Sequence, residues 1–191
     1  MSDPALIEAH TLGAVRGARV LFQDVSLTVH GGDGTVLRGA NGSGKTTLLR
    51  QLAGLSQPQA GTIVRNASHH WVGHTNGLKP HETPRSHLAH WAKVWGSQMQ
   101  VDSVLEQMKM RRPADVPSRM LSAGQKRRTA LGRLLLVPRD VWLLDEPFNA
   151  LDADGQAVLA GMIAAHRAGG GAVIAALHGS APIEISGEVM L

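Results

Sequence analysis

The sequence predicts an α/β protein with three recognisable parts. Apolar and polar residues alternate over residues 5–29, as in half-buried antiparallel strands, so a small β unit opens the chain. A short apolar run at residues 35–38 meets a glycine-rich loop and then a helix that ends near Gly54. Two continuous apolar segments, residues 141–146 and 172–178, are typical of buried strands in a parallel sheet. We therefore expect an α/β fold with an N-terminal antiparallel β subdomain.

The length of the chain favours one domain. Its 191 residues are enough to bury one core, and no repeat or long linker divides them, so we expect a single domain over residues 1–191. Residues 77–135 are helical in character but are interrupted by prolines. These prolines are Pro80, Pro84, Pro113 and Pro117. The middle of the chain is therefore predicted to be an inserted helical subdomain.

Composition excludes several classes of protein. The chain has no cysteine, which rules out disulfides and thiolate metal sites. Its net charge of +4 suits a polyanionic ligand but is also common for reasons of solubility. The opening MSDPALIEAH lacks the apolar core of a signal peptide, and no run approaches the roughly 18 apolar residues of a membrane span. We expect a cytosolic protein, at most peripheral to a membrane.

The glycine-rich loop predicts phosphate binding. GANGSGKT, residues 39–46, matches G-x-x-x-x-G-K-[ST] and follows a strand and precedes a helix, as a P-loop does. Its backbone N–H groups and the start of the helix would face phosphate oxygens, while Lys45 would reach the β- and γ-phosphates and Thr46 would bind Mg²⁺. The expected nucleotide-binding residues of this loop are Gly39, Ala40, Asn41, Gly42, Ser43, Gly44, Lys45, Thr46 and Thr47.

The segment VWLLDEP predicts the metal side of the same site. The apolar strand ends in Asp145 and Glu146, at the carboxyl edge of the sheet, where doubly wound folds bind ligands. Asp145 would hold the Mg²⁺ shell, and Glu146 would orient or deprotonate the water that attacks the γ-phosphate. An isolated Asp-Glu pair would more often be a surface feature, but the preceding apolar strand favours catalysis.

The pentapeptide LSAGQ, residues 121–125, predicts a second anion site. Ser122 is suited to cap the helix that follows, and the backbone of Ala123 and Gly124 would face an anion there. This helix is far from the P-loop in sequence. An ATP bound by one P-loop has a free face, which a second subunit could close.

Together these motifs resemble ABC ATPases over nearly the whole chain. LSAGQ resembles their signature motif, GANGSGKT their Walker A, VWLLDE their Walker B, and residues 149–152 their D-loop. The resemblance implies a homodimer that sandwiches ATP and Mg²⁺, in which Ser122, Gly124 and Gln125 contact the ATP held by the partner. It also implies that His178 is the switch histidine at the γ-phosphate and that Asp152 couples the two sites.

A narrower resemblance concerns the ATP-binding subunits of cytochrome c biogenesis exporters, the CcmA type. It is carried by LSAGQKRRTALGRLLL, LLDEPFNALD and residues 71–91, WVGHTNGLKPHETPRSHLAHW. It implies ATP hydrolysis at the cytoplasmic face of the bacterial inner membrane, by a peripheral subunit that works with an integral membrane permease of the CcmB type. The driven step would be haem export or release of a haem chaperone, and no nucleic acid is expected as a partner.

Two other functions remain open. The chain could serve another transported substrate, or it could be a soluble ABC-type ATPase that acts on ribosomes or DNA. The soluble class generally has two ATPase units in one chain, whereas this sequence contains one set of motifs. A small P-loop kinase is disfavoured by LSAGQ.

Two positions depart from the ABC pattern. The residue expected under the adenine is usually aromatic, but here it is Arg16, whose guanidinium could stack instead. The loop after residues 69–72 usually contains a glutamine that touches the metal and the attacking water. Thr75 stands there, and we expect either Thr75 acting through a water or the carboxamide of Asn76 to replace it, unless the loop is only a turn.

Three groups of residues suggest less specific roles. Six of the ten histidines lie between His69 and His90, and we expect a solvated, mildly basic face there in preference to a metal site. Trp91 and Trp95 share one helix face, which is more often core than partner contact. Residues 126–128, Lys-Arg-Arg, are expected to form an exposed helix face.

Overall fold

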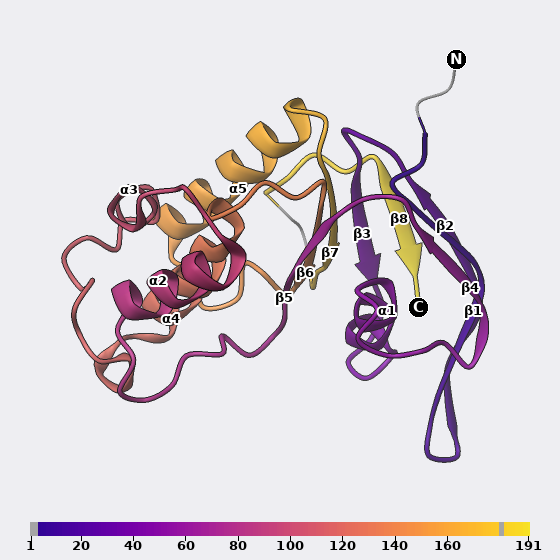
Figure 1. Ribbon diagram of the computed structural model, residues 1–191. Coiled ribbons are helices and arrows are strands. Elements are labelled where there is room, and N and C mark those ends of the chain that lie inside the picture. Colours follow the sequence, from indigo (N-terminus) through magenta and orange to yellow (C-terminus); the bar gives the residue numbers. More distant parts are fainter. Residues whose placement is uncertain (1–3, 180–181) are drawn as a thin grey trace. The chain divides into compact units, whose positions relative to one another are not determined.

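A computed structural model describes residues 4–179 and 182–191 of the chain (Figure 1). The chain forms two compact units. The first contains the residues up to His74, Arg139–Glu146 and the residues from Ile163 onward, and the second contains Thr75–Pro138 and Pro147–Met162. The predicted single domain 1–191 includes residues 1–3 and 180–181, which lie outside the described residues, and residues 1–3 also belong to the opening segment MSDPALIEAH. The grouping into one domain stays a prediction.

A five-stranded parallel sheet forms the centre of the first unit. Its strand order is β5-β6-β7-β3-β8, and every neighbouring pair is parallel. The strands are β3 (Gly34–Arg38), β5 (His69–Val72), β6 (Val141–Asp145), β7 (Ala172–Ala176) and β8 (Gly187–Met190). Every residue of β6 and β7 is buried, which confirms the prediction that these apolar segments are interior strands. The short strand β8 was not predicted from the sequence.

A three-stranded antiparallel sheet, in the order β2-β1-β4, completes the strands of the first unit. It contains β1 (Ile7–Arg16), β2 (Arg19–Val29) and β4 (Ala60–Arg65), and β1 pairs with both neighbours. The expected N-terminal β unit is therefore confirmed. Helix α1 (Lys45–Leu52) contacts β1 as well as β6 and β7 (Figure 1).

Helix α1 ends as the sequence predicts. Gly54 has φ +70°, and its N–H donates to Gln51 O while the N–H of Leu55 donates to Arg50 O. These two bonds satisfy the last carbonyls of the helix through a left-handed glycine.

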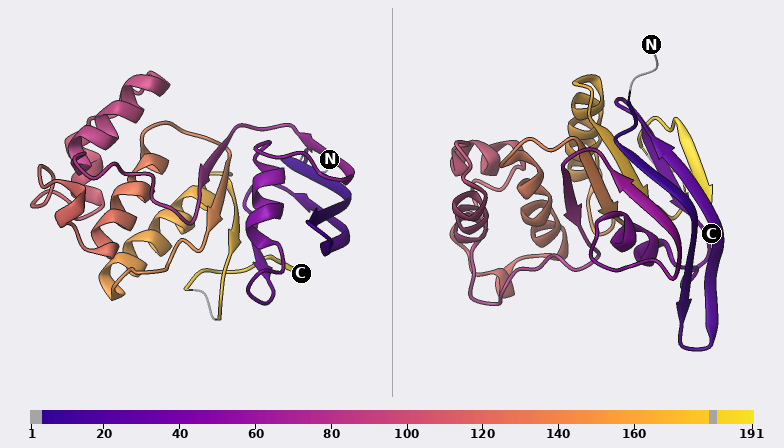
Figure 2. Two further views of the ribbon diagram at one scale, coloured as in Figure 1. Left: turned by 90° about the horizontal axis from the view of Figure 1, so that it is seen from below. Right: turned by 45° about the vertical axis from the view of Figure 1, so that its right-hand side comes forward.

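The second unit is helical. Helices α2 (Pro84–Trp95), α3 (Val101–Gln107) and α4 (Ala123–Gly132) contact one another in all three pairs (Figure 2). Two 3₁₀ turns, Ser118–Met120 and Arg133–Leu135, precede and follow α4. Helix α5 (Ala153–Ala168) begins in this unit. No helix among the described residues has the length and apolar content needed to cross a lipid bilayer.

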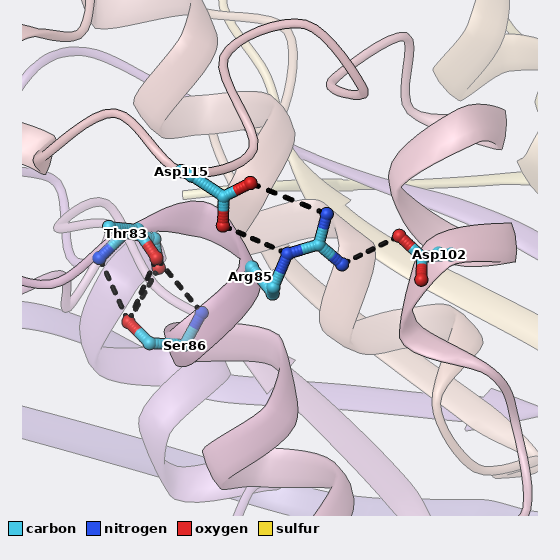
Figure 3. Close-up of polar contacts among 5 residues, drawn as sticks. All are labelled: Thr83, Arg85, Ser86, Asp102 and Asp115. Atoms are coloured by element: carbon cyan, nitrogen blue, oxygen red, sulfur yellow. Dashed lines mark hydrogen bonds and ion pairs between the residues drawn. The ribbon is translucent and has the colours of Figure 1, made fainter.

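Polar contacts tie α2 to its surroundings within the second unit (Figure 3). Thr83 caps the helix, because its hydroxyl accepts from Ser86 N and the Ser86 hydroxyl accepts from Thr83 N. Arg85 contacts Asp102 of α3 at 2.6 Å and Asp115 of the following loop at 2.9 Å, and these carboxylates raise the pKa of the guanidinium, Asp102 more than Asp115. Salt bridges as exposed as these add little stability, so their main effect is to fix orientation.

Candidate functional site

The glycine-rich loop is shaped to surround an anion. Gly39, Gly42 and Gly44 have φ values of +144°, +78° and +112°, which L-residues with side chains rarely adopt. A Cβ on Gly39 would lie 2.6 Å from Ser43 Oγ and 2.4 Å from Leu191 O, so only glycine fits there. Ser43 Oγ is buried and has no hydrogen-bond partner among the described residues, which leaves a polar atom available to a phosphate.

Lys45 is held inside this loop. Its Nζ donates to Gly39 O at 2.8 Å and to Ala40 O at 3.0 Å, and the residue is 6% exposed. A buried ammonium bonded to two carbonyls of the loop is close to any anion that the loop binds. The position of Lys45 fits the role expected from the sequence.

Thr46 and Asp145 come together from distant parts of the chain. Thr46 lies in the first turn of α1 and Asp145 ends β6, and Thr46 Oγ1 donates to Asp145 Oδ2 at 2.8 Å. Asp145 is 2% exposed. A hydroxyl and a carboxylate in contact form the kind of oxygen donor set that Mg²⁺ prefers, so these residues fit the expected metal.

Glu146 contacts His178, the histidine that the resemblance assigns to the γ-phosphate. The His178 ring nitrogen Nε2 lies 3.0 Å from Glu146 Oε1, and the two residues follow the adjacent strands β6 and β7. Glu146 has φ +49°, an uncommon backbone conformation for a residue with a side chain, and its N–H donates to Ala176 O at 3.0 Å. Backbone strain of this kind is frequent at functional sites.

One cavity of the first unit collects most of the expected residues. It is lined by Arg16, Leu21, Asn41, Gly42, Gly44, Lys45, Thr46, Thr47, Glu146 and His178. Arg16 thus lies in the same cavity as the phosphate loop, where a base could stack on its guanidinium. Leu21 was not anticipated. Leu21 lies in β2, which pairs with the end of β1 that contains Arg16. Only this pairing, and no motif in the sequence, indicates that Leu21 lines the cavity.

A second cavity, within the second unit, contains the LSAGQ residues. It is lined by Lys109, Met110, Ser122, Ala123, Gly124, Gln125, Arg128, Ala150 and Asp152. Ser122 caps α4 as predicted: its hydroxyl accepts from Gln125 N at 3.1 Å, and Gln125 Oε1 accepts from Ser122 N at 2.9 Å. The reciprocal bond from Gln125 gives this glutamine a structural role beside the expected contact with ATP.

The LSAGQ helix and the segment 149–152 are joined within the second unit. Arg128 pairs with Asp152, whose carboxylate also accepts from Gly155 N at 2.9 Å. The bond from Gly155 and the pair with Arg128 lower the pKa of Asp152, so this carboxylate stays ionised. A Cβ on Gly124 would lie 2.7 Å from Ala150 O. Gly124 is thus required for the close approach of the two segments.

The expected exposed face at residues 126–128 is wrong: Arg127 is buried, and Lys126 and Arg128 are half-buried. Arg127 is 3% exposed; its Nε donates to Pro147 O at 3.2 Å, and its Nη1 lies 3.4 Å from Asn76 Oδ1. The side chain of Arg128 is only 12% exposed, because it pairs with Asp152. The sequence pattern could not show that these cations have partners elsewhere in the chain.

The expected solvated histidine face is also partly wrong. His70 and His87 are 4% and 2% exposed. His87 lies in α2 with Nδ1 2.9 Å from Glu82 Oε2, and burial lowers its pKa despite this carboxylate. The described residues contain no group of three or more histidine or acidic residues that could hold a metal ion. Trp91 and Trp95 are half-buried, with ring centroids 4.9 Å apart.

Comparisons with known proteins agree with this geometry. The family model for ABC transporters matches residues 22–149. A cytochrome c biogenesis ATP-binding export protein CcmA from Hyphomonas neptunium is 54% identical over 191 residues, covering 100% of this chain and 99% of the relative. The protein of the same name from Paracoccus denitrificans is 43% identical, covering 91% of this chain and 82% of the relative.

Solved structures share the fold. An ATP-binding subunit of an ABC transporter matches with a TM-score of 0.80 and 23% identity, covering 91% of this chain and 79% of the other. An ABC transporter ATP-binding protein from Pyrococcus furiosus matches with a TM-score of 0.80 and 21% identity, covering 97% and 96%. At these identities the structural matches establish the fold alone.

Proposed function

Because this chain belongs to the ABC transporter family, we propose that it is the ATP-hydrolysing subunit of an exporter that serves cytochrome c biogenesis. The observation that carries this proposal is the 54% identity over the full length of a CcmA protein. The structure supports it, because the phosphate loop, Glu146 and His178 line one cavity. ATP is the nucleotide that this family binds.

The first unit provides the groups for hydrolysis. Glu146 accepts a proton from the attacking water, whose oxygen bonds to the γ-phosphorus while the bond to the bridging oxygen breaks and ADP leaves. Lys45 and the loop N–H groups hold the phosphates in line with the water. His178 can turn from Glu146 toward the γ-phosphate, because both residues line the cavity.

Thr46 and Asp145 would hold Mg²⁺, which on binding would neutralise charge on the β- and γ-phosphates. The contact of 2.8 Å between their oxygens supports this assignment. Asp145 is the last residue of β6 and is buried, and Glu146 follows it in the chain. The two carboxylates therefore have separate roles, one toward the metal and one toward the water.

We further propose that two chains form a homodimer with ATP between them. Ser122, Gly124 and Gln125 line a cavity of the second unit that contains the start of α4, and a helix start favours an anion. This cavity would receive the ATP bound by Lys45 of the other chain. Asp152, held by Arg128 and Gly155, would couple the two sites.

The membrane partner follows from the family. An ABC transporter ATPase works with a membrane permease, and we propose a permease of the CcmB type at the cytoplasmic face of the bacterial inner membrane. The whole chain, 1–191, would act as one ATP-binding domain with the helical insertion at about 77–135. The driven step would be haem export or release of a haem chaperone.

A cellular assay tests the proposed function. Cells that lack this chain should fail to attach haem covalently to c-type cytochromes, and the wild-type gene should restore attachment. The Lys45→Ala variant should not restore it, because loss of a charged contact to the phosphates is expected to weaken ATP binding about 10- to 100-fold. Normal cytochrome c in cells without the chain, or a defect confined to translation or DNA repair, would contradict the proposal.

A further inference from the structure

Glu146 is contacted by two histidines and not one. His74 Nδ1 lies 3.3 Å from Glu146 Oε2, and His178 Nε2 lies 3.0 Å from Oε1, so each imidazole faces its own carboxylate oxygen. The three residues are far apart in the sequence, so the sequence alone does not predict that both histidines contact Glu146. All three belong to the first unit of the structure.

The parallel sheet accounts for this arrangement. Strand β6 lies between β5 and β7, and Glu146, His74 and His178 each follow one of these strands. Val72 pairs with Leu144, so two further residues along both strands bring His74 level with Glu146. Both residues lie just beyond the ends of their strands, at the same edge of the sheet. The contact is thus a consequence of strand order and register.

The two histidines have different surroundings. His178 lines the nucleotide cavity together with Glu146, whereas His74 is absent from its lining. The side chain of His74 is also more exposed, at 66% against 41% for His178. If His178 turns toward the γ-phosphate during hydrolysis, its contact with Oε1 is lost. The contact of His74 with Oε2 can persist, because His74 has no place in the cavity.

We propose that His74 is a positioning residue that keeps the Glu146 carboxylate aligned with the attacking water when His178 engages the nucleotide. This inference rests on the proposed function, since it concerns the same hydrolysis. It also bears on the loop in which Thr75 replaces the usual glutamine. Asn76, the other expected substitute, has its Oδ1 3.4 Å from Arg127 Nη1. His74, which directly precedes both of them in the chain, contacts Glu146.

The chain leaves the first unit directly after His74 and directly after Glu146. The contact between these side chains therefore joins two points at which the backbone enters the helical unit.

The test measures steady-state ATP hydrolysis by purified full-length protein. The His74→Ala variant should lower kcat about tenfold, because it removes a polar contact that aligns the charged carboxylate, while KM for ATP stays unchanged. The His74→Asn variant should recover most of kcat, because its amide nitrogen stands at the same number of bonds from Cα as Nδ1. A residue needed only for folding would not lower kcat at an unchanged KM in one variant and restore kcat in the other.

Two comparisons make the result specific. In the Glu146→Gln background, His74→Ala should lower the residual rate less than twofold, because the carboxylate it positions is gone. His10→Ala should leave kcat unchanged, since it removes an exposed contact of 3.6 Å with Glu8 that does not line the cavity. A kcat for His74→Ala within twofold of wild type, or no recovery with asparagine, would overturn the inference alone. A Glu146→Gln protein with wild-type turnover would instead contradict the proposed function.

Discussion

The Glu146→Gln variant is expected to bind ATP as the wild type does and to hydrolyse it about 10² to 10⁴ times more slowly, the usual cost of losing a general base. The amide is nearly the same size as the carboxylate, so the cavity keeps its shape. The amide, unlike the carboxylate, cannot accept the proton of the attacking water. Nucleotide binding and hydrolysis should therefore separate in this variant.

The measurement compares equilibrium binding of ATP with the rate of phosphate release. Glu188→Gln is a matched control, because Glu188 pairs with Arg38 at 2.9 Å in the same sheet but does not line the nucleotide cavity. The control should hydrolyse ATP at the wild-type rate. Hydrolysis by Glu146→Gln at the rate of the control would show that another group deprotonates the water.

The Gly124→Ala variant is expected to lose about 10²-fold in hydrolysis although alanine is the better helix former. The new Cβ would lie 2.7 Å from Ala150 O, so the segment that carries Asp152 must shift away from the LSAGQ helix. Misplacing either segment misaligns the face presented to the ATP of the partner chain. Binding of ATP by a single chain should be unaffected, because Gly124 does not line the cavity of the phosphate loop.

Gly161→Ala provides the control for this substitution. Gly161 lies in α5, and a Cβ built on it meets nothing within 4 Å. Its hydrolysis rate should equal that of wild type. Equal rates for Gly124→Ala and Gly161→Ala would mean that the contact with Ala150 has no part in catalysis.

The phosphate-binding loop, residues 39–46, could be predicted from the sequence because its residues are consecutive. The pattern GANGSGKT requires left-handed glycines between a strand and a helix, and these conformations are found at Gly39, Gly42 and Gly44. The pair Asp145 and Glu146 was placed correctly at the end of a strand, since the run of four apolar residues before it, 141–144, favours burial in a core.

The second histidine on Glu146 could not be predicted in this way. It depends on β5 being the neighbour of β6 and on the register of that pair, which involve residues about 70 positions apart. The same limit explains the error at Arg127 and Arg128. A run of three basic residues resembles a solvated face, and only the fold shows that Pro147, Asn76 and Asp152 lie beside it.

The central claim is that catalysis needs the phosphate loop of one chain and the LSAGQ helix of another. Lys45→Ala disables the first element and Ser122→Arg blocks the second, so each variant alone should have no active site. A mixed dimer contains one site with an intact Lys45 and an intact Ser122.

The direct measurement is ATP hydrolysis by an equal mixture of the two variants, with mixed dimers verified by differently tagged chains. Because half of randomly formed dimers are mixed and each has one of two sites intact, we expect about a quarter of the wild-type rate. No activity in verified mixed dimers would contradict the composite site, and so would full activity of the Ser122→Arg protein by itself.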